Sequence, residues 1–183
     1  MVATAALKRK GELVRQLTAF CRIIDAISDK TGKGVSFLIL FLALALVYEV
    51  VARYVFNRPT QWAHEFGMFM FGTACMLVGA YVLLHKAHVN LDILYARVTR
   101  RKQAILDLIT APVFFFVMVL IIWHSTDFAL NSWKMLEVSS SPWHPPYYPI
   151  KTIIPIAALL LLLQGVVKFT RDLFFVIHGR ELE

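Results

Sequence analysis

The stretch that decides the fold is GVSFLILFLALALVYEVVARYVF, at residues 34–56, together with a second apolar stretch at residues 62–84. Each exceeds the roughly 20 residues that a helix needs to cross a hydrocarbon core about 30 Å thick. Only NRPTQ, residues 57–61, separates them. The two stretches therefore predict a tight antiparallel hairpin of membrane-spanning helices.

Two further apolar stretches, at residues 103–130 and 150–171, are also long enough to span a membrane. Of the 183 residues, 58% are hydrophobic and 17% are charged, whereas a soluble domain has about 25% charged residues. This composition excludes an ordinary soluble protein and leaves little chain for a catalytic domain. We expect an all-α protein, a single membrane domain over residues 1–183, with four transmembrane helices.

Two polar segments flank these spans and have amphipathic patterns. The N-terminal segment, residues 1–33, carries apolar side chains at helical spacing and ends at KTGKG, which predicts a separate helix along the membrane surface. The segment at residues 85–102 has an apolar helical face with arginines off it, and predicts a second surface-lying arm. The apolar positions of the first segment are Leu13, Leu17, Phe20, Ile24 and Ile27.

The basic residues predict the orientation of the chain. Fifteen lie in the N-terminal segment, in the 85–102 arm or after residue 167, whereas three lie on the other side, namely Arg58, Lys134 and Lys151. Cytoplasmic loops carry the excess of Lys and Arg in membrane proteins, so both termini are expected in the cytoplasm. The formal net charge of +7 is explained by this placement and does not indicate nucleic acid.

Charged residues inside spanning helices are candidates for function. Arg53 and Glu65 lie equally far from the turn of the first hairpin, so we expect them to pair across it, with Trp62 beside them. Glu49 lies four residues before Arg53, a spacing that also favours pairing. The cluster is interpreted as a structural clasp; contact with a partner subunit and a role in ion or substrate passage are the alternatives.

Histidines give two weaker signals. His85, His88 and Asp92 share one face of the 85–102 arm, which fits a metal site or, more simply, a polar surface. His64 and His124 fall near the same membrane surface and are compatible with a haem in a cytochrome b-like electron-transfer subunit. We expect neither a metal nor a cofactor, because neither set has the further ligands that it needs.

Small residues form a stripe on the second span, at Gly72, Cys75 and Gly79. Such stripes let helix backbones approach closely, either within one chain or against another subunit. No arrangement of a nucleophile with a base, and no phosphate-binding glycine loop, occurs in the sequence, so an enzyme is not expected.

Several stretches together resemble the small membrane subunit, of DctQ type, of tripartite ATP-independent periplasmic (TRAP) transporters. They are Arg53 with Tyr54, QWAHEF around Trp62 and Glu65, and LVGAYVLLHKAHVNLDILY, which contains Gly79, His88 and Asp92. The resemblance implies a bacterial inner-membrane protein that braces a large membrane subunit. It also implies a periplasmic binding protein and sodium-coupled uptake of an organic acid.

The segment at residues 131–149 contains SSSPWHPPYYP, whose four prolines predict an extended, polyproline-like loop on the periplasmic side. Its aromatic residues either form a belt at the headgroup level or dock the binding protein that the resemblance implies. The candidate docking residues are Trp143, His144, Tyr147 and Tyr148.

Overall fold

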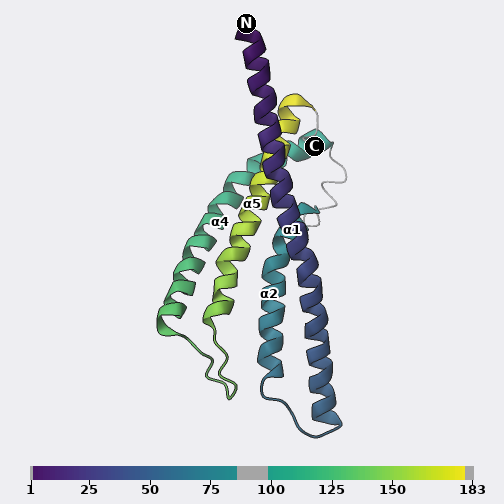
Figure 1. Cartoon of the computed structure of the whole chain (residues 1–183), viewed down its shortest axis with the longest axis vertical. Coiled ribbons are helices and arrows are strands. Elements are labelled where there is room, and N and C mark those ends of the chain that lie inside the picture. Colours follow the sequence, from purple (N-terminus) through teal and green to yellow (C-terminus); the bar gives the residue numbers. More distant parts are fainter. Residues whose placement is uncertain (1, 86–98, 180–183) are drawn as a thin grey trace.

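The computed structural model describes residues 2–85 and 99–179, and this part of the chain is built from helices (Figure 1). Each of the four helices contains a stretch long and apolar enough to cross a membrane, which confirms the expected fold class. The helices are α1 (Val2–Tyr54), α2 (Ala63–Leu84), α4 (Arg100–Met135) and α5 (Tyr148–His178).

The four helices form an open fan instead of a closed bundle. In Figure 1 they follow the order α4, α5, α2, α1, and α5 packs against all three others. The start of α1 and the end of α5 lie at one end of the fan, called here the terminal end. At the opposite end, called the loop end, the pair α4–α5 diverges from the pair α1–α2. In the most apolar window of each helix, 28% of α5 is buried but only 6% of α4, so most of the spanning surface is exposed.

The N-terminal segment differs from the sequence prediction, because α1 continues through KTGKG without a break. Thr31 and Lys33 bond within the helix, to the carbonyl of Ile27 and the carboxylate of Asp29. Gly32 does not interrupt the helix; it lets the ring of Tyr81 on α2 approach, since a Cβ there would lie 2.1 Å from that ring. The glycine that resembled a helix boundary is thus a site of helix–helix contact.

The apolar face of the N-terminal segment packs on α5 only in part. Ile24 is buried with Cys21 against Val167, whereas Leu17 and Phe20 are exposed. This packing joins the segment to the fan at the terminal end.

The helices α4 and α5 extend beyond the predicted spans at both ends. Gly179, in the left-handed conformation with φ of 66°, ends α5. Residues 86–98, which make up most of the predicted 85–102 arm, lie outside the described residues, as do His88 and Asp92.

The loop between α4 and α5 is folded back on itself, so the predicted polyproline-like loop is wrong. The Ser139 amide donates to the Pro145 carbonyl and the Tyr147 amide donates to the Glu137 carbonyl, both at 2.9 Å. Val138 and Pro146 form an antiparallel bridge between the two arms. Prolines lack an amide donor, but their carbonyls still accept, which allows a hairpin-like loop with this composition.

Candidate functional site

Glu49 organises the polar contacts at the α1–α2 turn. Its carboxylate is buried and accepts hydrogen bonds from the guanidinium of Arg53, with the Nε atom at 3.0 Å. It also accepts from the amide of Thr60 at 3.1 Å and from the Thr60 hydroxyl. One carboxylate thereby holds the turn against the end of α1. Arg53 is neutralised within its own helix.

The expected pairing of Arg53 with Glu65 is wrong. Glu65 instead accepts hydrogen bonds from the hydroxyls of Ser139 and Ser141, both at 2.6 Å, in the loop between α4 and α5. The Tyr147 hydroxyl donates to Ser139 Oγ at 3.2 Å and extends the network. Glu65 therefore anchors the α4–α5 loop to the start of α2, and joins the two helix pairs at the end where they diverge.

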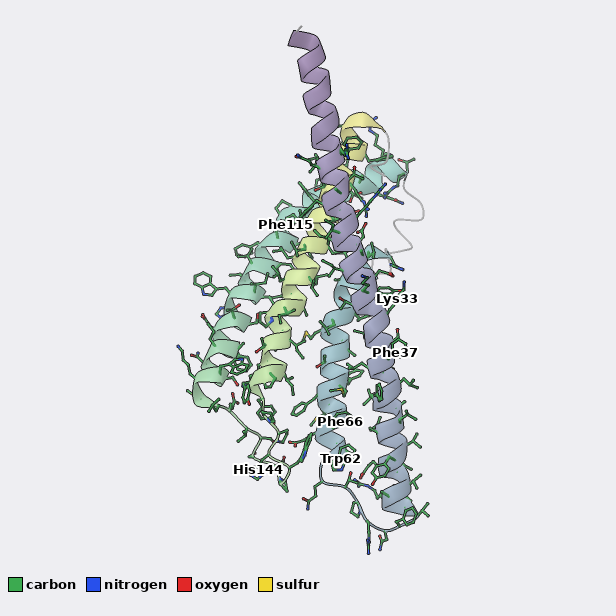
Figure 2. All side chains as sticks on the ribbon, viewed as in Figure 1. Lys33, Phe37, Trp62, Phe66, Phe115 and His144 are labelled. Carbon is green, nitrogen blue, oxygen red and sulfur yellow. The ribbon has the colours of Figure 1, made fainter. Side chains whose placement is uncertain are left out.

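Aromatic side chains also lie at the loop end, where Figure 2 labels Trp62 and Phe66 at the start of α2 and His144 of the loop. Trp62 stacks near Tyr48 of α1, with ring centroids 6.1 Å apart, and its centroid lies 6.5 Å from that of Trp143 in the loop. The two tyrosines among the candidate docking residues pack inside the protein, Tyr147 on Phe69 and Tyr148 on Trp133.

The four candidate docking residues thus fall into two kinds. Trp143 is 41% exposed and His144 is also exposed, at a backbone φ of 50°. Tyr147 and Tyr148 are half-buried and contribute to packing. Of these four residues, Trp143 and His144 are the two whose side chains are exposed to a partner at the loop end.

A second contact fixes the base of the same loop. Lys151 Nζ lies 2.5 Å from the carboxylate of Glu137, which also accepts from the Ser132 hydroxyl at 2.8 Å. The bonds from Lys151 and Ser132 lower the pKa of Glu137 below its ordinary value. Glu137 therefore stays ionised to a lower pH than an ordinary glutamate, and the contact weakens as the pH falls through its lowered pKa.

At the terminal end, a buried polar cluster joins α1 to α5. The side-chain amide of Gln164 accepts from Ser28 Oγ at 2.9 Å and donates to Asp25 at 3.0 Å. Arg171 pairs with the same Asp25 at 2.6 Å. Gln164 and Ser28 are almost completely buried. The one signal of this cluster in the sequence is the single Gln that follows five consecutive leucines.

Two ion pairs join α4 to α5 nearby. Lys168 lies 3.1 Å from Asp107, and Arg100 lies 4.0 Å from Asp172 while its guanidinium stands over the Phe175 ring. Together with the Gln164 cluster, these pairs concentrate the polar contacts of the terminal end on α5.

The small-residue stripe of α2 faces outward over part of its length. A Cβ built on Gly79 would lie 3.8 Å from Leu161 of α5. A Cβ built on Gly72 would have no neighbouring atom within 4 Å. Cys75 is exposed. Among the described residues, the stripe contacts another helix at Gly79, whereas its Gly72 and Cys75 positions are uncovered.

The geometry gives no support to metal or haem binding in the described part of the chain. No group of three His, Cys, Asp or Glu side chains gathers among residues 15–85 and 99–177. His64 and His124 are both exposed, on α2 and α4, and α5 lies between these helices (Figure 1). The polar side chains described here bond mainly to one another, an arrangement that holds helices in place.

Comparison with known proteins identifies the family. The DctQ component of tripartite ATP-independent periplasmic transporters matches residues 42–175, which is most of the chain. The chain belongs to the DctQ family. Comparison with curated protein sequences gave no match. This DctQ protein is accordingly a small inner-membrane subunit of a TRAP transporter, and the matched region contains both the Glu65 anchor and Gln164.

Proposed function

We propose that this DctQ subunit is a static brace for the large membrane subunit of a transporter that takes up an organic acid with a sodium gradient. A periplasmic binding protein delivers the substrate, and both termini of the brace lie in the cytoplasm. The polar contacts of Glu49, Glu65 and Gln164 stabilise the arrangement of its helices, and these residues do not bind the substrate. Family membership and the distribution of basic residues support this proposal.

The observation that carries the proposal is the open fan. A closed four-helix bundle buries its apolar faces in its own interior, but in the most apolar window of α1 only 11% is buried. The apolar surface extends along both outer helices, as exposed side chains of α1 and α4. A flat layer of helices with two open faces is suited to lie along a larger membrane protein, with lipid on the other face.

A brace is needed because a mobile transport domain moves only relative to something that stays in place. The helix α1 has 53 residues, which corresponds to about 80 Å, far more than the thickness of the hydrocarbon core. It is fixed to α5 near its midpoint, where Asp25 and Ser28 bond to Gln164. We expect this rigid extension to resist tilting of the complex in the bilayer.

The small-residue stripe provides a test of assembly. Gly72→Leu adds a side chain where the chain has open space, so the subunit should fold but should no longer allow a partner helix to approach. We expect much less large subunit to co-purify with the tagged variant. Phe71→Leu, at a neighbouring position that is 62% exposed, is the control. Co-purification unchanged by Gly72→Leu would show that the partner binds elsewhere.

Trp143 and His144 are proposed to contact the binding protein. The loop that carries them is held by Glu65 and by its own bridge, so little conformational entropy is lost when a partner binds. Tryptophan is among the residues that contribute most to interfaces. The alternative is that Trp143 only anchors the loop in the headgroup region.

Trp143→Ala separates these two roles. If Trp143 docks the binding protein, transport by the complete transporter should fall at limiting binding protein and recover when binding protein is in excess. Trp123→Ala is the matched control, because Trp123 is 67% exposed within the α4 span. Transport by Trp143→Ala equal to wild type at every concentration of binding protein would refute docking through this residue.

A further inference from the structure

A cavity of about 190 Å³ lies between α4 and α5, beside Leu83 at the end of α2. Its wall has a charged part and an apolar part. The charged part consists of Asp107, Lys168 and Asp172. The apolar part is formed mainly by the rings of Phe114, Phe115 and Phe169.

The two parts are stacked along the helix axes. On α4, Asp107 precedes Phe114 by seven residues, or about 10 Å. On the antiparallel α5, Gly165 precedes Asp172 by the same distance. Asp107 and Asp172 therefore lie toward the terminal end, and Phe114 and Phe115 lie toward the middle of the fan, while Lys168 and Phe169 are at the level between them.

The deep end of the cavity is closed by a close helix contact. A Cβ built at Gly165 would lie 2.2 Å from the ring of Phe114, so the absence of a side chain lets α4 approach α5 at this level. The cavity is consequently a recess with one apolar closed end and one charged end.

The recess lies at the depth where lipid headgroups meet acyl chains. Asp107 and Asp127 bound the apolar part of α4 and are 20 residues apart, which corresponds to about 30 Å, the thickness of a hydrocarbon core. Asp107 thus marks one border of the core, and Phe114 lies inside it. A phospholipid at this position would place its polar headgroup beside the charged part of the wall and its acyl chains beside the apolar part.

The charges of the wall fit a ligand that carries both signs. Lys168 lies 3.1 Å from Asp107, and Asp172 lies 4.0 Å from Arg100, which does not line the wall; the charges of the wall together with Arg100 sum to zero. Each carboxylate has about four acceptor positions and each ammonium has three donors, so these pairs are able to bond a further group. An overall neutral set of charges disfavours a ligand with a net charge.

We infer that this recess binds the headgroup region of a zwitterionic phospholipid with a primary amine, such as phosphatidylethanolamine. The phosphate is placed at Lys168 and the ammonium at Asp107 and Asp172, while the start of one acyl chain lies along the phenylalanine rings. At about 190 Å³ the recess admits only part of the lipid, and the rest of its chains stays in the bilayer. The lipid acts as a wedge that sets the spacing of α4 and α5.

The test is native mass spectrometry of the full chain purified in mild detergent, with lipids added at equal concentration. The probes are phosphatidylethanolamine, phosphatidylcholine and phosphatidylglycerol with the same chains. We expect phosphatidylethanolamine to be retained about tenfold more than phosphatidylcholine, the equivalent of about one charge-assisted hydrogen bond. Soluble glycerophosphoethanolamine should not be retained, because it lacks the chains.

Two variants and a control locate the binding. Ala111 lines the recess and is 9% exposed, so Ala111→Leu should fill it and reduce retention about tenfold. Val113→Leu is the control. Val113 lies two residues after Ala111 and is 66% exposed, so this variant should retain the lipid as wild type does.

Asp107→Asn keeps the shape of the wall and removes one of the two carboxylates proposed to bind the ammonium, so it should clearly reduce the preference for phosphatidylethanolamine over phosphatidylcholine. Because it is isosteric, it tests the inference even if Ala111→Leu fails to fold. Equal retention of all three lipids by wild type would overturn the inference, as would a preference for phosphatidylglycerol. An Asp107→Asn variant that keeps the full preference for phosphatidylethanolamine would overturn it too.

Discussion

Gln164→Ala is expected to destabilise this DctQ subunit by about 2–4 kcal/mol, from two lost hydrogen bonds and the lost volume of a buried side chain. Gln164 is 2% exposed and connects Ser28 with Asp25 across the α1–α5 contact. Without it, the hydroxyl of Ser28 loses its acceptor in a buried position. Thermal unfolding in detergent, followed by circular dichroism, measures the effect.

A double variant distinguishes the hydrogen bonds from packing. Replacing both partners of a buried hydrogen bond by apolar groups is far less costly than removing one of them. Ser28→Ala combined with Gln164→Leu should therefore be more stable than Gln164→Ala. Leu159→Ala, at a position of α5 that is 47% exposed, is the control and should have a small effect. A Gln164→Ala variant as stable as this control would show that the cluster does not hold α1.

Glu65→Ala is expected to release the loop between α4 and α5 from α2. The carboxylate is the acceptor for both Ser139 and Ser141, and bonds to a charged acceptor are stronger than neutral ones. Hydrogen–deuterium exchange should be about tenfold faster or more for the amides of Ser139 and Tyr147, whose bonds hold the two arms of the loop together. Amides in the middle of α2 should exchange as before.

His64→Ala is the matched control for Glu65→Ala. His64 precedes Glu65 on α2 and is exposed, so its removal should leave the loop amides unchanged. Exchange in the loop that is the same in Glu65→Ala as in wild type would contradict the anchor. In that case the bridge between Val138 and Pro146 and the Glu137–Lys151 pair would be sufficient to hold the loop.

The spans were predictable from the sequence because hydropathy and length decide them locally. The four apolar stretches and the short link between the first two are each read from consecutive residues. The glycine at position 32 was misinterpreted, because its role depends on Tyr81, far away in the sequence. A glycine in a helix breaks it or admits a neighbour, and only the packing decides which.

The partners of the charged residues were predictable only where they lie on the same helix. The spacing of Glu49 and Arg53 indicates their pair directly. Glu65 finds its partners more than 70 residues away, in a loop whose hairpin-like shape brings Ser139 and Ser141 to α2. The prolines of this loop pointed to an extended chain, because their composition does not reveal which carbonyls accept bonds.

As a brace, this subunit should not transport by itself. The most direct measurement is uptake of an organic acid into proteoliposomes under an inward sodium gradient. The liposomes contain this chain alone, or this chain with its large TRAP subunit and the binding protein. We expect uptake only in liposomes that contain all the components; uptake by this chain alone would show that it is a transporter and not a brace.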